Sequence, residues 1–529
     1  MSPRTSAGLP RPVAAAALAV GLFTAVFILL LAKGSSFHTD DWSFVLGRAG
    51  HSPGVFLEPH NEHLSLVPIA IYKVLLELVG LDHFEVFRLV LVLVNLAGAG
   101  VLLVLVARAA DPVWALLATV PVALMGAAWS GMVSPFQISF SMSMLAGLCA
   151  LLALDRRSVK GDLVACALLL VALASSGLGL PWLVVAGLEL LLRRPWLRRV
   201  WVILVPFAAY LAWYAVYGER TGSGIEDPIS FAANAAAAVV GGYVGLDATW
   251  GRTLVVLGLV LAGWRISRLG RVPVRTISAL GGALTFWGLT GLVRDPASFG
   301  ESRYLLPGAI WVVLAAGPLL PKAPPTRRQL LVASGAVACF LIAGSAYFVG
   351  GRRVLVDGNR PTYARLLAVE LARDRVAPGF QPDAQRVPHV SAEPYLAALG
   401  RYKGSPAMTV DEARAADPGT RREFDEALVG ALRIRIAPVL VEPSDECEVA
   451  EGEPLDLAMP AGGLSLDVPA DGDATVALRR LGDPGEGAPS FTAPAGAESD
   501  LAIPRDRLED PWHATVTGPP GTRACGIGG

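Results

Sequence analysis

Long uncharged apolar segments alternate with short polar connections from the N-terminus to about residue 350. The first of them, residues 13–32, has the roughly 20 residues that a helix needs to cross a bilayer. The same length rule predicts ten further spans, at residues 85–107, 113–129, 138–154, 163–177, 180–192, 200–217, 251–265, 276–293, 304–320 and 330–349. We therefore expect a mostly α-helical chain with a polytopic transmembrane domain of about eleven helices in residues 1–350.

Two of the connections carry helical patterns of their own. Residues 64–79 place apolar side chains at helical spacing, with Lys73 and Glu77 one turn apart, which predicts a helix lying along the membrane surface. Residues 229–249 are rich in small side chains and only weakly apolar, so we expect a similar surface role for them. The first long connection, residues 33–84, is thus predicted to be an ordered loop.

The pattern changes near residue 350. Residues 361–375 and 420–433 have the pattern of short helices on a soluble domain. Beyond about residue 437, alternating segments such as 464–468 and 474–478 are separated by Gly, Pro and Asp, which is typical of β-strands joined by turns. Residues 351–529 are therefore predicted to form an α+β domain that ends in a β-sandwich-like module.

Composition narrows the class of protein. The chain is 53% hydrophobic and only 17% charged, with a mean hydropathy of +0.52, which excludes a water-soluble globule and implies the lipid bilayer as a partner. The formal net charge of −1 lacks the basic excess of a general nucleic-acid binder. We expect no nucleic-acid partner.

The charges of the connections predict the orientation of the spans. Every second connection is basic, namely Arg108 and residues 155–160, 193–199, 265–275 and 322–328. By the positive-inside rule, the N-terminus is cytoplasmic and the 33–84 loop lies outside, in a multi-pass protein of the plasma (inner) membrane. Arg352 and Arg353 depart from this alternation, but we still expect an extracytoplasmic C-terminal domain. The first span is interpreted as a retained helix because it lacks a small-x-small cleavage site and further spans follow.

The cysteines separate into two groups. Cys149, Cys166 and Cys339 fall inside apolar spans, where small core residues are the simplest interpretation. Cys447 and Cys525 lie in the hydrophilic C-terminal domain, and an extracytoplasmic location allows them to form a disulfide. Two free thiols are the alternative.

Ionisable residues gather in the 33–84 loop, which contains five of the seven histidines. Asp40 and Asp41 follow the first span directly, and either carboxylate suits a general base or a metal ligand, whereas the alternative is an ordinary helix cap. His60, Glu62 and His63 form a second cluster. It is compatible with a divalent metal such as Mg²⁺ or Mn²⁺, or with a hydrogen-bond network that contacts an acceptor.

Three arginines are expected near the same outer face of the membrane. Arg88, Arg294 and Arg303 are candidates for binding phosphate, because a guanidinium matches phosphate oxygens bidentately. Tyr304 follows Arg303 directly, and the alternative for this pair is to anchor a helix at the interface, where both residue types are common.

Three sequence features and their order give a resemblance to a known family. A first transmembrane helix that ends in an acidic pair, followed by a long outer loop with surface helices, resembles the GT-C superfamily of polyprenyl-phosphate-sugar glycosyltransferases. Residues 82–90 (DHFEVFRLV) are similar to the family's entry into its second helix. Residues 303–307 (RYLLP) resemble a segment before a late helix of its mannosyl- and aminoarabinosyltransferase branch. The resemblance covers roughly residues 13–350.

The resemblance implies an integral-membrane glycosyltransferase. Such an enzyme moves a sugar from a polyprenyl-phosphate donor to an extracytoplasmic acceptor of the cell envelope, which is a glycan, a lipid or a protein. Two departures leave the donor and the metal requirement open: Asp40-Asp41 stands where the mannosyltransferases have Asp-Glu, and His60–His63 stands where the aminoarabinose transferases have Lys-Pro-Pro. The alternative is a non-catalytic membrane scaffold or transport component of envelope assembly with the same architecture.

Overall fold

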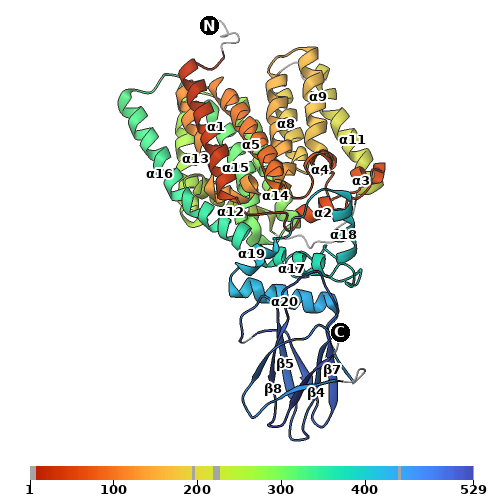
Figure 1. The fold of residues 1–529 in the computed structure, drawn as a ribbon. Helices are drawn as coiled ribbons and strands as arrows, with labels where there is room; N and C mark the ends of the chain where they lie inside the picture. The colour runs from red at the N-terminus through yellow and green to blue at the C-terminus, as the bar shows by residue number, and fades with distance from the viewer. Residues whose placement is uncertain (1–7, 194–196, 219–226, 439–442, 486, 528–529) are drawn as a thin grey trace. The chain divides into compact units, whose positions relative to one another are not determined.

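The chain forms two compact units in the structure, a computed structural model that describes residues 8–193, 197–218, 227–438, 443–485 and 487–527 (Figure 1). The first unit comprises Met1–Gly34, Arg48–Leu75 and Glu85–Leu355. The second comprises Ser35–Gly47, Leu76–Phe84 and Val356–Gly529. Residues 194–196 of the basic connection expected at 193–199 lie outside the described residues.

The first unit is a bundle of helices. Its main helices are α1 (Arg11–Leu31), α3 (Pro53–Leu57), α5 (Phe84–Ala107), α6 (Pro112–Ala123), α7 (Trp129–Val133), α8 (Ile138–Leu154), α9 (Val159–Leu173), α10 (Gly179–Leu192), α11 (Trp201–Tyr217), α12 (Pro228–Tyr243), α13 (Ala248–Leu269), α14 (Val274–Val293), α15 (Ser302–Ala316) and α16 (Arg327–Arg352). Helix α4 (Leu66–Val79) begins in the first unit and ends in the second. Asp111, Ser158, Asp247 and Thr326 each cap a helix, because a side-chain oxygen accepts a backbone N–H of the first turn.

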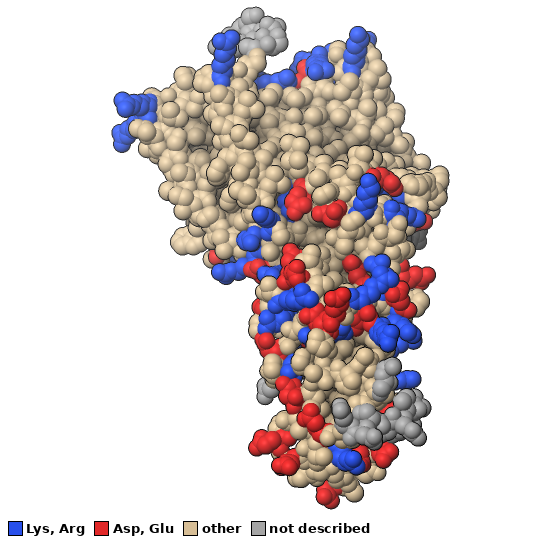
Figure 2. All heavy atoms as spheres, in the orientation of Figure 1, with Lys and Arg blue, Asp and Glu red and all other residues tan. Residues whose placement is uncertain are grey.

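Each of the eleven expected spans overlaps a helix, although the span expected at 113–129 runs past the end of α6 at Ala123, and the protein is a multi-pass membrane protein. By length and composition, six helical segments of the described residues are able to cross a bilayer: Arg11–Leu31, Phe84–Ala107, Pro135–Leu154, Val274–Val293, Ser302–Leu319 and Arg327–Leu371. The number rises to eight if two bent helix pairs each form one span. Helices α10 and α11, with 14 and 17 residues, are apolar but shorter than the usual span. The helical unit presents a broad uncharged surface (Figure 2).

Helix α12, expected along the membrane surface, buries seven of its 16 residues and packs against α13, α14 and α15. Small side chains allow this, since a Cβ on Gly251 of α13 would lie 1.8 Å from the carbonyl oxygen of Ala237 on α12. The two helices bend by 95° at a break that contains Gly245, whose φ of +80° suits glycine.

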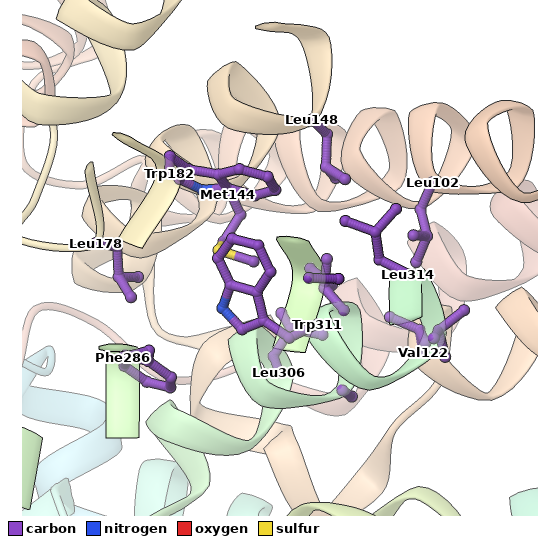
Figure 3. Close-up of a cluster of buried hydrophobic side chains, with 14 of the residues drawn as sticks. Leu102, Val122, Met144, Leu148, Leu178, Trp182, Phe286, Leu306, Trp311 and Leu314 are labelled. Atoms are coloured by element: carbon purple, nitrogen blue, oxygen red, sulfur yellow. The ribbon is translucent and has the colours of Figure 1, made fainter. Parts of the chain in front are cut away.

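The core of the first unit is built around two tryptophans (Figure 3). The rings of Trp182 and Trp311 are fully buried, with their centroids 4.1 Å apart. A Cβ on Gly147 would lie 2.0 Å from the Trp182 ring, and one on Gly282 would lie 2.9 Å from the Trp311 ring. Glycine at these two positions therefore lets the helices approach the large rings closely.

Buried charges in the first unit are paired in a network that includes residues of the basic connections. Asp155 accepts hydrogen bonds from Arg108, Arg193 and Arg275 at 3.3, 3.0 and 2.9 Å. Glu189, whose side chain is 2% exposed, contacts Arg193 and Arg275 at 2.7 Å each. The network joins α5, α10, α14 and the connection between α8 and α9.

The second unit combines short helices with two antiparallel sheets. Its helices are α2 (Asp41–Val45), α17 (Arg360–Leu371), α18 (Ala392–Arg401), α19 (Val410–Arg414) and α20 (Pro418–Leu432). Its strands are β1 (Ile436–Pro438), β2 (Pro443–Val449), β3 (Leu455–Ala458), β4 (Gly463–Asp467), β5 (Ala474–Arg479), β6 (Ser490–Ala493), β7 (Glu498–Ala502), β8 (His513–Thr517) and β9 (Arg523–Ile527). The sheet orders are β1-β7-β4-β9-β2 and β3-β8-β5-β6, which confirms the two-sheet module expected from the alternating pattern.

A buried carboxylate joins the helices of the second unit to its sheets. Asp425 on α20 is 1% exposed and accepts the backbone N–H groups of Arg480, Leu481 and Gly482 at 2.8–3.0 Å. These three amides directly follow β5, so the carboxylate satisfies donors that the strand leaves unpaired.

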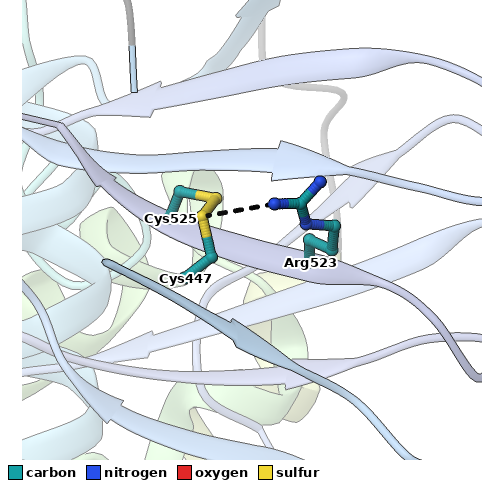
Figure 4. Close-up of a disulfide and its surroundings, with 3 residues drawn as sticks. All are labelled: Cys447, Arg523 and Cys525. Atoms are coloured by element: carbon teal, nitrogen blue, oxygen red, sulfur yellow. Dashed lines mark hydrogen bonds between the residues drawn. A yellow bond between two sulfur atoms is a disulfide. The ribbon is translucent and has the colours of Figure 1, made fainter. Parts of the chain in front are cut away.

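The expected disulfide between Cys447 and Cys525 is present (Figure 4). Cys447 on β2 lies directly opposite Cys525 on β9, so the bond joins neighbouring strands of the five-stranded sheet. The guanidinium of Arg523 lies 4.0 Å from the Cys447 sulfur. Because disulfides persist in oxidising compartments, the bond points to an extracytoplasmic C-terminal domain.

We predict that the Cys447→Ala/Cys525→Ala double variant destabilises the β-module. The bond links residues 78 positions apart, and closing a loop of that length contributes about 4 kcal/mol in the chain-entropy model. Hydrogen exchange of the full-length protein in detergent should become faster in peptides from β2, β4 and β9. The Cys166→Ala variant, which removes a buried free thiol, should leave exchange in these peptides unchanged, and equal exchange in the double variant would contradict the prediction.

Candidate functional site

The first unit contains a cavity of about 770 Å³. Its lining residues come from the 60–65 segment, from the connection between α9 and α10, and from helices α8, α10, α11, α14 and α15 with their adjoining residues. Six of the residues singled out in the sequence line it, namely His60, Glu62, His63, Arg294, Arg303 and Tyr304. The fold therefore brings together groups that lie up to 244 residues apart in the chain (304 minus 60).

A two-residue turn carries the histidines into the cavity. The backbones of His60 and His63 form two hydrogen bonds with each other, His60 N–H to His63 O at 2.9 Å and His63 N–H to His60 O at 3.0 Å. Asn61 and Glu62 between them have φ of +46° and +70°, as a type I′ turn requires. Asn tolerates this conformation, whereas for Glu it costs about 1 kcal/mol. Opposed residues of such a hairpin place their side chains on the same face.

The chain before this turn is held by two buried cations. Arg48, 8% exposed, donates to the Pro59 carbonyl at 2.6 Å and to the Glu58 carboxylate at 3.1 Å. Lys73 on α4 donates in turn to the backbone carbonyls of Arg48 and Gly50. The indole N–H of Trp213 on α11 donates to the Leu57 carbonyl at 2.7 Å. Helices α4 and α11 thus fix the position of the turn.

The ring of His63 packs against the break between α9 and α10. A Cβ on Gly177 would lie 2.8 Å from the ring, so only glycine leaves room for the imidazole there. Burial lowers the pKa of His63, and the nearby positive charge of Arg294 lowers it further. The negative charge of Glu62 and a backbone hydrogen bond raise the pKa, but the net result is still a lowered pKa. The imidazole is therefore neutral at neutral pH.

Two arginines supply positive charge to the cavity. Arg294 follows α14, and no carboxylate of the described residues lies within ion-pair distance of it. Arg303, at the start of α15, contacts Glu301 at 2.6 Å and stacks over the Tyr304 ring with its Cζ 5.0 Å from the centroid. The Arg303 Nε is buried without a hydrogen-bond partner among the described residues. This donor set suits an anionic ligand.

An apolar and aromatic wall completes the cavity. Helix α11 contributes Phe207, Tyr210, Leu211 and Tyr214, and helix α14 contributes Phe286, Leu289 and Val293. Phe207, Leu211, Tyr214, Leu289 and Val293 are each 40–47% exposed, so the rest of the bundle does not cover this wall. The cavity therefore combines a polar cationic region with an apolar wall, as a site for an amphiphilic anion requires.

The acidic pair belongs to the second unit. Asp41 is fully buried, and its carboxylate accepts the backbone N–H of His38 at 3.2 Å and lies 3.1 Å from the His38 Nδ1. Asp40 is half-buried at the N-cap position of α2, but its φ and ψ of −69° and −20° are already helical, unlike those of a typical capping residue. The pair thus holds one carboxylate bound to a histidine and one more accessible to solvent.

Arg88 has a different environment from the other two arginines. It lies in α5, is fully buried, and its Nε donates to the Val133 carbonyl at 3.1 Å. The lining of the cavity contains Arg294 and Arg303 but not Arg88. Among the described residues, no three His, Cys, Asp or Glu side chains are grouped closely enough to hold a metal ion.

Sequence reasoning missed the aromatic wall and the role of the helix break. Tyr210 and Tyr214 lie one turn apart on α11, which is the signal that they share a helix face. Residues 175–177 fall at the end of the span expected at 163–177, whereas Ser176 and Gly177 line the cavity. A glycine next to two serines within an apolar region was the available signal.

The fold and the site define a multi-pass helical membrane protein with a C-terminal β-sheet domain and an amphiphilic cavity in its helical unit. No family model, curated protein or solved structure matches the chain.

We predict that Arg294→Gln raises the pKa of His63. The substitution removes one positive charge that disfavours the imidazolium, while burial, the larger cause, remains. The titration is measured by NMR of histidine-labelled protein in detergent, with the His63 signal assigned through His63→Gln. Arg252→Gln, on α13 outside the cavity lining, is the matched control and should leave the pKa unchanged. Equal His63 pKa values in wild type and Arg294→Gln would rule out the electrostatic contact.

Proposed function

We propose that the protein is an integral-membrane glycosyltransferase that moves a sugar from a polyprenyl-phosphate donor to an extracytoplasmic acceptor of the cell envelope. The observation that carries the proposal is the composition of the cavity, where Arg294 and Arg303 lie with the wall of α11 and α14. A lipid phosphate has both properties that such a site selects, namely a charged head and an apolar tail. The resemblance of residues 13–350 to the GT-C superfamily supports the same assignment.

Arg294 and Arg303 are proposed to bind the donor phosphate. Transfer breaks the bond between the anomeric carbon and the phosphate oxygen, forms a bond to the acceptor oxygen or nitrogen, and leaves polyprenyl phosphate. Negative charge grows on the departing phosphate, and guanidinium groups stabilise it through charge-assisted hydrogen bonds. Arg294 has no carboxylate partner among the described residues, so it does not have to exchange one ion pair for another.

The acidic pair is proposed to take the proton that the acceptor loses. Asp40 is the better candidate because it is half-buried, whereas Asp41 is fully buried against His38. A carboxylate at the base position has to be reachable by the acceptor and ionised before the reaction. In this proposal Asp41 orients the segment and Asp40 receives the proton.

The proposed orientation places the N-terminus in the cytoplasm and the 33–84 loop and C-terminal domain outside. The alternating basic connections support it, and so does the disulfide between Cys447 and Cys525. An outer-leaflet lipid donor then meets an acceptor of the envelope on the same side.

We predict that Arg294→Ala and Arg303→Ala each weaken donor binding at least about tenfold, since each removes a charge-assisted contact. The test is purified protein in lipid, titrated with radiolabelled polyprenyl-phosphate sugars and assayed for both binding and transfer. Arg268→Ala, an exposed arginine outside the cavity lining, is the control. Absence of binding to wild type would overturn the proposed function. Binding without transfer to any acceptor would favour the scaffold or transport alternative.

We predict that Asp40→Asn retains donor binding and lowers turnover at least about a hundredfold, the usual scale for a positioned general base. Single-turnover transfer in the same assay separates this effect from donor binding. Glu77→Gln, in the same loop, removes an exposed carboxylate that is not assigned to proton transfer and should reduce turnover far less. Full activity in both Asp40→Asn and Asp41→Asn would exclude the acidic pair as the base.

A further inference from the structure

The turn that carries His60 and His63 contains glutamate where a strained backbone favours glycine. Type I′ turns have positive φ at both central residues, and glycine is strongly preferred at the second of them. That second residue is Glu62, with φ of +70°. Strained positions of this kind persist where the surrounding structure holds them, and they cluster at functional sites. Arg48, Lys73 and Gly177 provide the necessary support here.

The carboxylate of Glu62 is available to a ligand. Glu62 lines the cavity, and among the described residues its carboxylate makes no hydrogen bond and no ion pair. The cavity contains two arginines, yet Arg303 pairs with Glu301 instead, and no carboxylate lies within 4.0 Å of Arg294. Glu62 is therefore not there as the counterion of the phosphate-binding residues.

We propose that Glu62 binds the sugar of the donor, with its carboxylate accepting hydrogen bonds from sugar hydroxyl groups. The inference rests on the proposed function and assigns the polar part of the cavity to two tasks, the arginines for the phosphate and the Glu62 carboxylate for the sugar. An ionised carboxylate is an acceptor with up to four lone-pair positions, which suits a ligand rich in hydroxyl donors. The strained turn presents this acceptor to the cavity between two histidines.

Three variants separate the charge of Glu62 from the strain of the turn. Glu62→Gln keeps the size of the side chain and the strained backbone, and replaces the carboxylate by an amide. Glu62→Gly relieves the strain and removes the side chain. Asn61→Gly is the matched control, since it relaxes the neighbouring left-handed residue and leaves the carboxylate in place.

The probes separate the sugar from the phosphate. Full-length protein in detergent is titrated with mannosyl and arabinofuranosyl farnesyl phosphate, and with methyl farnesyl phosphate, which is a phosphodiester of the same charge without a sugar. We expect Glu62→Gln and Glu62→Gly to weaken binding of at least one sugar phosphodiester about tenfold, the scale for a hydrogen bond to a charged group. Binding of the methyl phosphodiester should change less than about twofold, and Asn61→Gly should bind all three like wild type.

Thermal unfolding provides a second measurement. Glu62→Gly should keep or raise the melting temperature, because relief of the left-handed conformation offsets the greater freedom of the unfolded chain. A clear decrease would make Glu62 a structural residue and overturn the proposal. Equal binding of sugar phosphodiesters by wild type and Glu62→Gln would overturn it while leaving the proposed function intact. Failure of wild type to bind any of the three probes would overturn both.

Discussion

Charges buried in a membrane-spanning bundle have to be paired within the protein, and the helical unit depends on this constraint. An unpaired ionised side chain in such surroundings costs several kcal/mol, so it is either neutralised or compensated. Glu189 is compensated by Arg193 and Arg275, and Asp155 is shared by three arginines. These contacts connect helix ends that the hydrophobic pattern alone does not place next to one another.

The cavity contains half-buried charges that are not paired in this way, which makes it the candidate site. Arg294 and Glu62 both line it, yet neither is in an ion pair among the described residues. Around Asp155 the bundle pairs each charge with a charge of opposite sign. The simplest explanation for the missing partners of Arg294 and Glu62 is that these side chains bind a ligand, an anion in one case and hydroxyl groups in the other. The neutral state of His63 fits this environment, because burial and the neighbouring Arg294 both disfavour a further positive charge.

Rigid supports, rather than the turn itself, determine where the site residues lie. The 60–63 turn contains two residues in the left-handed region, so it is not stable by local preference alone. Contacts from Arg48 and Lys73 hold the chain before it, and Gly177 makes space for the His63 ring. The energy that maintains the turn therefore comes from contacts outside the turn, as preorganised sites require.

The sequence by itself determined the apolar helices and the β-module, because the hydrophobic periodicity that predicts them is a local property. It also indicated the pairing of Cys447 and Cys525, because the predicted topology places both cysteines in an extracytoplasmic domain. It also identified Arg294, Arg303 and the 60–63 cluster by residue type. Only the tertiary structure decided which of them share a cavity, that Arg88 is buried and does not line it, and which helices α12 packs against. Such outcomes depend on long-range packing and charge pairing, whose partners the local sequence does not specify.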